Sequence, residues 1–455
     1  MPGEAESVNQ FLNHPMRKAL AVPRPAPDTT PDDNLTSLPS SPTRRGSSAV
    51  APCVAEKGAV DSAALSRVEA VIADALGRVF SAAVLFVSRS GSTVLHRAYG
   101  FLDPETSRQP AQLDTLFDLA SVTKLFTTTA FMRLVEAGKV ALDQPVATVL
   151  PAFRGLRPIQ PYEDPLHPGQ EVAVVPQTDE KVDAGWVTFR HLLTHTSGLP
   201  AWSPLFRLGS RQAAIEAVLA SPFSYPPGTR VVYSDLGFIL LGEAISHLTG
   251  QPLDAALGRL VLEPLGLKAT GFRPLAGTTC RPTATIAATE FCAWRGRRLV
   301  GEVHDENAAR LEGVAGHAGL FSTAEELARL GEMYLWLSLA GRESARAQRE
   351  SAIPMLLRPD TMAEMTRLQA EDGTTRRGLG FALWSPDPEA SSHPFSQLAF
   401  GHTGFTGTSL WIDPQRELVV ACLTNRVYYG RDPQGITAFR VALHQAIVAA
   451  SEDQL

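Results

Sequence analysis

Strand-like segments lie near both ends of this chain, and helix-like segments fill the middle. Apolar runs and alternation predict strands at 82–87 and 93–99, and again at 378–384, 398–402, 408–412 and 418–424. Strands from both ends of a chain can pair in one sheet when the chain between them folds as a separate lobe. The pattern therefore predicts an α+β fold: an antiparallel sheet built from both chain ends, flanked by terminal helices, with an inserted all-helical lobe.

Helical spacing of apolar residues accounts for the terminal helices and for the lobe. Segments 61–77 and 436–450 are the predicted terminal helices. The helices predicted between them are 121–137, 188–195, 210–220, 235–249, 253–262, 323–340 and 358–368. A cleft between the lobe and the sheet is the expected functional site, because ligand sites favour such junctions.

The first 58 residues differ in composition from the remainder. Segment 21–52 is rich in Pro, Ser, Thr and Asp and nearly free of aromatic residues, so it cannot bury enough apolar surface to offset its ordering entropy. We therefore predict a disordered leader at 1–58 and one domain at 59–455. A misassigned start codon would also account for such a leader.

Charge and hydropathy exclude several classes of protein. The net charge is −6 and no stripe of Lys or Arg is present, so a nucleic-acid partner is not expected. No apolar run is long enough to span a bilayer, and the chain as written has no secretory signal, which predicts a cytoplasmic protein unless the start site is misassigned. The four cysteines (Cys53, Cys280, Cys292 and Cys422) have no metal-binding spacing and are predicted to be free thiols.

A serine and a lysine three residues apart, Ser121 and Lys124, open the apolar segment 121–137. At a helix start this spacing puts both side chains on one face, next to backbone N–H groups that can hold an oxyanion. A lysine buried among apolar or cationic groups can have a lowered pKa and take the serine proton. Only six of the 41 cationic residues are lysines, and Lys124 alone has a serine three residues earlier. The alternative, a capping serine beside a solvated lysine, conflicts with the apolar flanks.

Two further motifs lie at long range. Tyr233-Ser234-Asp235 precedes segment 235–249, where a tyrosine beside a lysine could pass protons and Asp235 could also cap the helix. His402-Thr403-Gly404 ends a predicted strand, where small residues let a substrate run along the strand edge. Each motif alone is weak, since the first also fits a strand end and the second a β-bulge.

Taken in chain order, the motifs S-x-x-K, Y-x-D and H-x-G resemble the signature of the serine β-lactamase and penicillin-binding protein superfamily. The similarity is greatest to the class C β-lactamase-related branch, which includes carboxylesterases, D-amino-acid peptidases, transesterases and muropeptide amidases. The stretches 192–200, 303–308 and 313–323 resemble the same family. The resemblance covers roughly residues 62–450.

The resemblance implies a role for each motif residue. Ser121 would be the acyl-forming nucleophile, Lys124 would take or relay its proton, and Tyr233 would be the partner base that also activates the deacylating water. Asp235 should contact Lys124, and His402 and Gly404 would line the substrate edge of the cleft. The N–H groups of Ser121 and Phe405 would form the oxyanion hole. The resemblance implies no cofactor and no metal, and it leaves the oligomeric state open.

Two departures from the β-lactamase pattern bear on the substrate. His402 replaces the lysine of KTG, and no lysine follows Lys268, so no lysine is available there to hold a substrate carboxylate. Asp235 stands where many members have Asn and, when ionised, it can only accept hydrogen bonds. We therefore expect a small ester, or an amide that lacks an adjacent carboxylate. An arginine could supply the missing cation, but the sequence does not place one.

Two other functions remain open. A peptidoglycan-directed amidase or D-amino-acid peptidase, or a β-lactamase, is the first, and a non-catalytic ligand-binding domain on the same fold is the second. His191 and His195 have the spacing of a zinc pair, but no third ligand is apparent, so a structural role is favoured. His304 and Asp305 either line the cleft or order the loop at 275–318.

Overall fold

The computed structural model describes residues 53–54, 62–167, 169–174, 181–276, 285–340 and 353–452. Two residues of the predicted leader form a short strand, β1 (Cys53–Val54), and the rest of segment 1–58 lies outside the described residues. Cys280 also lies outside them. Cys292 and Cys422 are buried free thiols, as predicted. No helix in the described part of the chain is long and apolar enough to cross a membrane.

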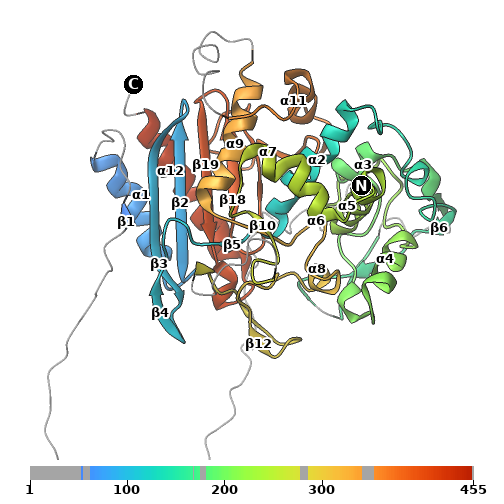
Figure 1. The fold of residues 1–455 in the computed structure, drawn as a ribbon, viewed down its shortest axis with the longest axis horizontal. Helices are drawn as coiled ribbons and strands as arrows, with labels where there is room; N and C mark the ends of the chain where they lie inside the picture. The colour runs from blue at the N-terminus through green and yellow to red at the C-terminus, as the bar shows by residue number, and fades with distance from the viewer. Residues whose placement is uncertain are drawn as a thin grey trace, which may run out of the picture.

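The main sheet joins the two ends of the chain, as the pattern predicts (Figure 1). Every strand pair in it is antiparallel, and β2 pairs directly with β19. In spatial order its described strands are β1, β3 (Ser92–Asp103), β2 (Ala82–Arg89), β19 (Leu418–Thr424), β18 (Ser409–Asp413), β17 (Phe400–Thr403), β16 (Ala382–Leu383), β15 (Thr375–Arg377) and β14 (Ala370–Asp372), with β4 (Ser107–Pro110) paired to β3.

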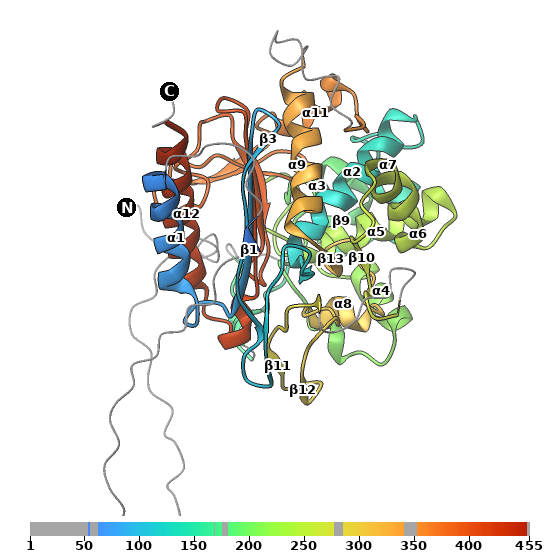
Figure 2. The same ribbon diagram turned by 60° about the vertical axis from the view of Figure 1, so that its left-hand side comes forward.

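Both faces of this sheet are covered, which explains why its central strands are apolar throughout. Successive side chains of β2 point to opposite faces. Val84 and Phe86 therefore lie in the core on the lobe side, and Leu85 and Val87 lie in the core under the terminal helices. Figure 2 shows α1 (Ser62–Ala75) and α12 (Pro433–Glu452) on one face and α9 (Ala324–Ser338) on the other.

The remaining elements build the lobe and its connections. Its longer helices are α2 (Thr123–Glu136), α4 (Arg211–Leu219), α5 (Asp235–Thr249) and α11 (Pro359–Thr366). Shorter helices are α3 (Phe189–Leu193), α6 (Leu253–Leu257), α7 (Glu263–Leu265) and α8 (Glu306–Arg310). The short strands are β5 (Phe117–Asp118), β6 (Leu156–Pro158), β7 (Tyr162–Glu163), β8 (Glu171–Val172), β9 (Lys181–Asp183), β10 (Gly271–Phe272), β11 (Phe291–Cys292), β12 (Arg297–Arg298) and β13 (Leu320–Ser322).

Two local predictions were wrong. The predicted strand 378–384 is a tight turn followed by the two-residue strand β16, because Gly380 has a φ of +74° and its backbone packs against Thr128. Asp235 does not cap α5. The Ser234 hydroxyl accepts the capping bond from Gly237 N, and Asp235 is the first helical residue, which leaves its carboxylate free for another partner.

Candidate active site

Ser121 lies in a strained turn between a strand and a helix. β5 pairs with β13, and the chain then passes through Leu119 into a 3-10 turn (Ala120–Val122) that leads into α2. Ala120 has a φ of +45°, a left-handed conformation that a residue with a Cβ seldom adopts. The buried Asp118 carboxylate holds it there by accepting a 2.8 Å bond from Ala120 N. The turn leaves Ser121 partly exposed at the start of the helical segment.

Lys124 is fully buried directly behind Ser121, and it has three partners. Its Nζ donates to Ser121 Oγ at 3.0 Å, to Asp235 Oδ1 at 2.7 Å and to the main-chain oxygen of His317 at 3.0 Å. These bonds use all three donors of an ammonium group. The predicted contact between Lys124 and Asp235 is therefore present, and it joins α2 to α5.

The charge state of Lys124 differs from the expected one. Burial by itself lowers the pKa of Lys124, but the Asp235 carboxylate and the neighbouring Tyr233 outweigh it, so the pKa is raised above its ordinary value. A lysine held as ammonium cannot accept the serine proton in this state. It can instead donate a hydrogen bond to Ser121 Oγ, which favours the alkoxide.

Tyr233 lies beside this pair, with Lys124 Nζ 4.9 Å from the centre of its ring. Lys124 and Ser121 both lower the pKa of the Tyr233 hydroxyl, yet no described residue meets that hydroxyl at hydrogen-bonding geometry. Burial is the largest influence, and the pKa of Tyr233 is raised overall. The hydroxyl is therefore close to Ser121 and free to accept or donate a proton.

The third motif approaches from the sheet. The His402 ring, on β17, lies 5.9 Å from that of Tyr233, centre to centre. His402 Nδ1 lies 2.8 Å from the main-chain oxygen of Thr403, so this nitrogen carries the proton and donates. Burial, with help from Lys124 and Arg377, puts the pKa of His402 well below its ordinary value. The lowered pKa agrees with the prediction that His402 is mostly neutral at pH 7.

Two threonines tie the loop after β17 to the turn that carries Ser121. Thr406 Oγ1 donates to Asp118 O at 2.7 Å, and Thr408 Oγ1 donates to Leu119 O at 2.8 Å. Gly404 lies in the same contact, where a Cβ would be 2.5 Å from Leu119 O. These bonds bring the backbone around Phe405 next to Ser121, as an oxyanion hole shared by two segments requires.

The loops around 305 and 317 also reach the site. Asp305 caps α8 by accepting from Ala308 N, and its Oδ1 lies 3.0 Å from His317 Nε2. Together with Asp235, these two residues place three potential metal-ligand atoms within 4.8 Å of one another. The two carboxylates already have partners in Lys124 and His317, which accounts for their closeness. His304 stacks on the Phe405 ring at 5.7 Å, so both members of the predicted pair lie at the site.

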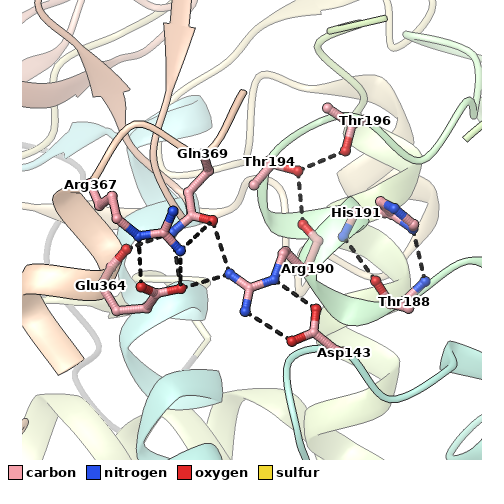
Figure 3. A network of polar contacts seen from close by, with 9 residues as sticks. All are labelled: Asp143, Thr188, Arg190, His191, Thr194, Thr196, Glu364, Arg367 and Gln369. Carbon is pink, nitrogen blue, oxygen red and sulfur yellow. Dashed lines mark hydrogen bonds and ion pairs between the residues drawn. The ribbon is translucent and has the colours of Figure 1, made fainter. Parts of the chain in front are cut away.

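His191 and His195 serve as structural partners. His191 Nδ1 accepts from Thr188 N in the capping box of α3, which Figure 3 shows beside the ion pair of Arg190 and Glu364 that links α3 to α11. His195 Nδ1 accepts from Ser234 N at 3.0 Å, and its ring packs 4.4 Å from that of Tyr233. The stretch at 192–200 therefore supports the tyrosine motif.

Two residues near the site were not found from the sequence, Asp118 and Arg377. Asp118 accepts from Ala120 N and from His304 N, a partner 186 residues away. Arg377, on β15, lies with its guanidinium carbon 5.3 Å from the centre of the Tyr233 ring. No local pattern separates either residue from the other acidic residues or arginines of the chain.

The fold and this site define a serine hydrolase of the β-lactamase and penicillin-binding-protein type. The family model described as Beta-lactamase matches residues 68–444, and the chain belongs to that family. The N-acetylmuramyl-L-alanine amidase of Bacillus subtilis (strain 168) is 32% identical over 397 residues, which cover 82% of this chain and 83% of that protein. A putative D-alanyl-D-alanine carboxypeptidase of Salmonella paratyphi B is 32% identical over 399 residues, or 80% and 83% of the two chains.

Solved structures agree on the fold. EstCE1, a hydrolase with promiscuous acyltransferase activity, superimposes with a TM-score of 0.61 at 23% identity, over 84% of this chain and 99% of its own. A simvastatin synthase mutant from Aspergillus terreus gives a TM-score of 0.62 at 20% identity, over 88% and 100% of the two chains. At these identities the likeness concerns the fold alone.

Proposed function

We propose that this protein cleaves an amide or ester bond of a small substrate through an acyl-enzyme formed on Ser121. The observation that carries the proposal is the contact of Ser121 Oγ with Lys124 Nζ at 3.0 Å, beside an unpartnered Tyr233 hydroxyl. Nucleophile, cation and base candidate thus come together from two segments more than a hundred residues apart, at the start of a helix.

In the proposed acylation, the minor phenolate form of Tyr233 takes the proton of Ser121 while Oγ bonds to the acyl carbon. Lys124, fixed as ammonium by Asp235, stabilises the developing charge on Oγ. The N–H groups of Ser121 and Phe405 hold the oxyanion, and the leaving group departs with the proton from Tyr233. In deacylation, Tyr233 removes a proton from a water whose oxygen bonds to the acyl carbon, and it returns that proton to Ser121 Oγ as the bond between Oγ and the acyl carbon breaks.

The relatives favour an amide as the bond that is cut, because two of them are named for amide cleavage. The third motif favours a substrate without a carboxylate next to that bond, because a neutral His402 stands where β-lactamases have a lysine. Peptidoglycan-derived amides and small esters are therefore the two substrate classes to compare.

The test has two parts, each run on wild type, Ser121→Ala and the control Ser246→Ala on α5. A neutral fluorophosphonate probe should label wild type and Ser246→Ala but not Ser121→Ala. A panel of p-nitrophenyl butyrate, D-amino-acid amides, muropeptides and nitrocefin then identifies the substrate class. Equal turnover by Ser121→Ala would refute the acyl-enzyme, and a wild type that neither reacts nor labels would indicate a ligand-binding domain.

A further inference from the structure

Arg377 is a buried cation without an acidic partner in the active site. Only 5% of its surface is exposed, its Nε has no hydrogen-bond partner, and no carboxylate among the described residues forms an ion pair with it. Burying a charge in this way costs free energy, so an isolated cation at a reaction centre calls for a functional reason.

The position of Arg377 is set by its neighbours along the sheet. Its main-chain oxygen accepts from Gln369 N at 2.9 Å, and its strand pairs with β16 opposite Ala382. Figure 3 shows the Gln369 side chain bonded to Arg190 of α3. The backbone of Arg377 is therefore fixed relative to the lobe that carries Tyr233.

The guanidinium faces the ring of Tyr233. Its central carbon is 5.3 Å from the ring centre, within the range of a cation–π contact. Among the described residues, the titratable or charged groups that face or influence this ring are Lys124 of α2, Asp235 of α5, His195 after α3, His402 of β17 and Arg377 of β15.

Arg377 is the one cation in this set whose charge is not compensated. Lys124 is 2.7 Å from the Asp235 carboxylate, which offsets part of its positive charge at the tyrosine. Burial and nearby cations hold the two histidines neutral by lowering their pKa. A phenolate on Tyr233 therefore gains a second positive charge, one without an ion-pair partner among the described residues, from Arg377.

We propose that Arg377 is a positioning residue of acylation whose guanidinium, lying over the Tyr233 ring, stabilises the phenolate that accepts the Ser121 proton. The inference rests on the proposed function, because it presupposes that Ser121 is acylated. In this arrangement neutral His402 shapes the edge of β17. Arg377, on β15, supplies a positive charge near the position where a lysine of the third motif would stand.

The size of the effect follows from Coulomb's law. If the 5.3 Å from the guanidinium carbon to the ring centre is taken as the separation of the two charges, an effective dielectric constant of about 20 gives an interaction equivalent to roughly two pH units. Removing the guanidinium charge should therefore slow acylation at a fixed neutral pH by about 10- to 100-fold. A neutral reagent should show this loss, since it needs no cation for binding.

The experiment measures the second-order rate of Ser121 labelling by a neutral fluorophosphonate at pH 8. Arg377→Met removes the charge, Arg377→Lys keeps it, and Arg376→Met is the matched control on the same strand, where Arg376 pairs with Glu371. We expect Arg377→Met to be about 10- to 100-fold slower than wild type, while Arg377→Lys and Arg376→Met stay within about threefold of it. Arg377→Gln serves as a second neutral variant if melting curves show that the methionine variant unfolds.

A second arm separates electrostatics from a merely structural role. Replacing tyrosine throughout by 3,5-difluorotyrosine gives a more acidic phenol, which should restore most of the rate lost in Arg377→Met. A slow variant that difluorotyrosine does not restore would overturn the inference. A neutral variant that labels at the wild-type rate would also overturn it, and a KM increase confined to carboxylate-bearing substrates would then identify Arg377 as a substrate anchor. A wild type without labelling would instead count against the proposed function.

Discussion

Removing the Asp235 carboxylate should change the sign of the contribution that Lys124 makes to the pH dependence of the free energy of unfolding. In the wild type the pKa of Lys124 is raised, so its stabilising contribution is fully present below the unfolded value of about 10.4 and is lost as the pH rises through the folded value. Between pH 7 and 9 this group therefore contributes no slope to the wild type.

Asp235→Asn leaves burial as the dominant influence on Lys124, which lowers its pKa below the unfolded value. The unfolded chain then binds more protons than the folded one, so the stability of the variant rises with pH by up to about 1.4 kcal/mol per unit. Breaking a buried ion pair costs about 3–5 kcal/mol. The amide oxygen of Asn still accepts from Lys124, which places the expected loss near the lower end at pH 7.

The measurement is urea unfolding of both proteins at pH 7, 8 and 9, read as the difference in free energy of unfolding so that other groups cancel. The control is Asp143→Asn, which removes an ion pair whose Asp143 side chain is 72% exposed to solvent. Its loss should stay below about 1 kcal/mol and should not change with pH. A deficit of Asp235→Asn that stays constant or grows with pH would refute the reasoning.

Two backbone predictions concern the nucleophile turn. In Gly404→Ala the new Cβ would lie 2.2 Å from Thr408 Oγ1, so the loop must shift, and the N–H of Phe405 that we propose as an oxyanion donor must shift with it. Ser121 labelling should then fall about 100-fold or more, while Gly209→Ala, with open space around it, should label normally. Ala120→Gly should leave the free energy of unfolding within about 1 kcal/mol of wild type, because relief of the left-handed strain offsets the entropy of glycine. Thermal denaturation that shows a loss above about 2 kcal/mol would contradict this estimate.

The sequence predicted those parts of the fold that depend on local pattern. The central strands were recognised because apolar side chains fill both faces of the sheet, and α12 because Phe439, Leu443 and Ile447 follow helical spacing along one face. The pair Ser121 and Lys124 was recognised because its spacing works only on a helix.

The features that the sequence did not reveal depend on contacts between residues that lie far apart in the chain. Asp235 appeared suited to capping α5, yet Ser234 does so, because the carboxylate is drawn to Lys124 across the lobe. A lowered pKa was expected for Lys124 from burial alone, and the outcome depends on that same carboxylate. Arg377 and Asp118 act through contacts with Tyr233 and Ala120 that no spacing rule relates to them.

The pairing of β2 with β19 has a consequence for how the protein matures. Val87 pairs with Val420, and Thr406 of the C-terminal part holds the backbone next to Ser121. A nascent chain emerging from the ribosome therefore lacks β17 to β19 and the proposed oxyanion donor Phe405 until residues 400–424 have been synthesised. The proposed active site around Ser121 can therefore be completed only after this C-terminal part of the sheet is available for pairing.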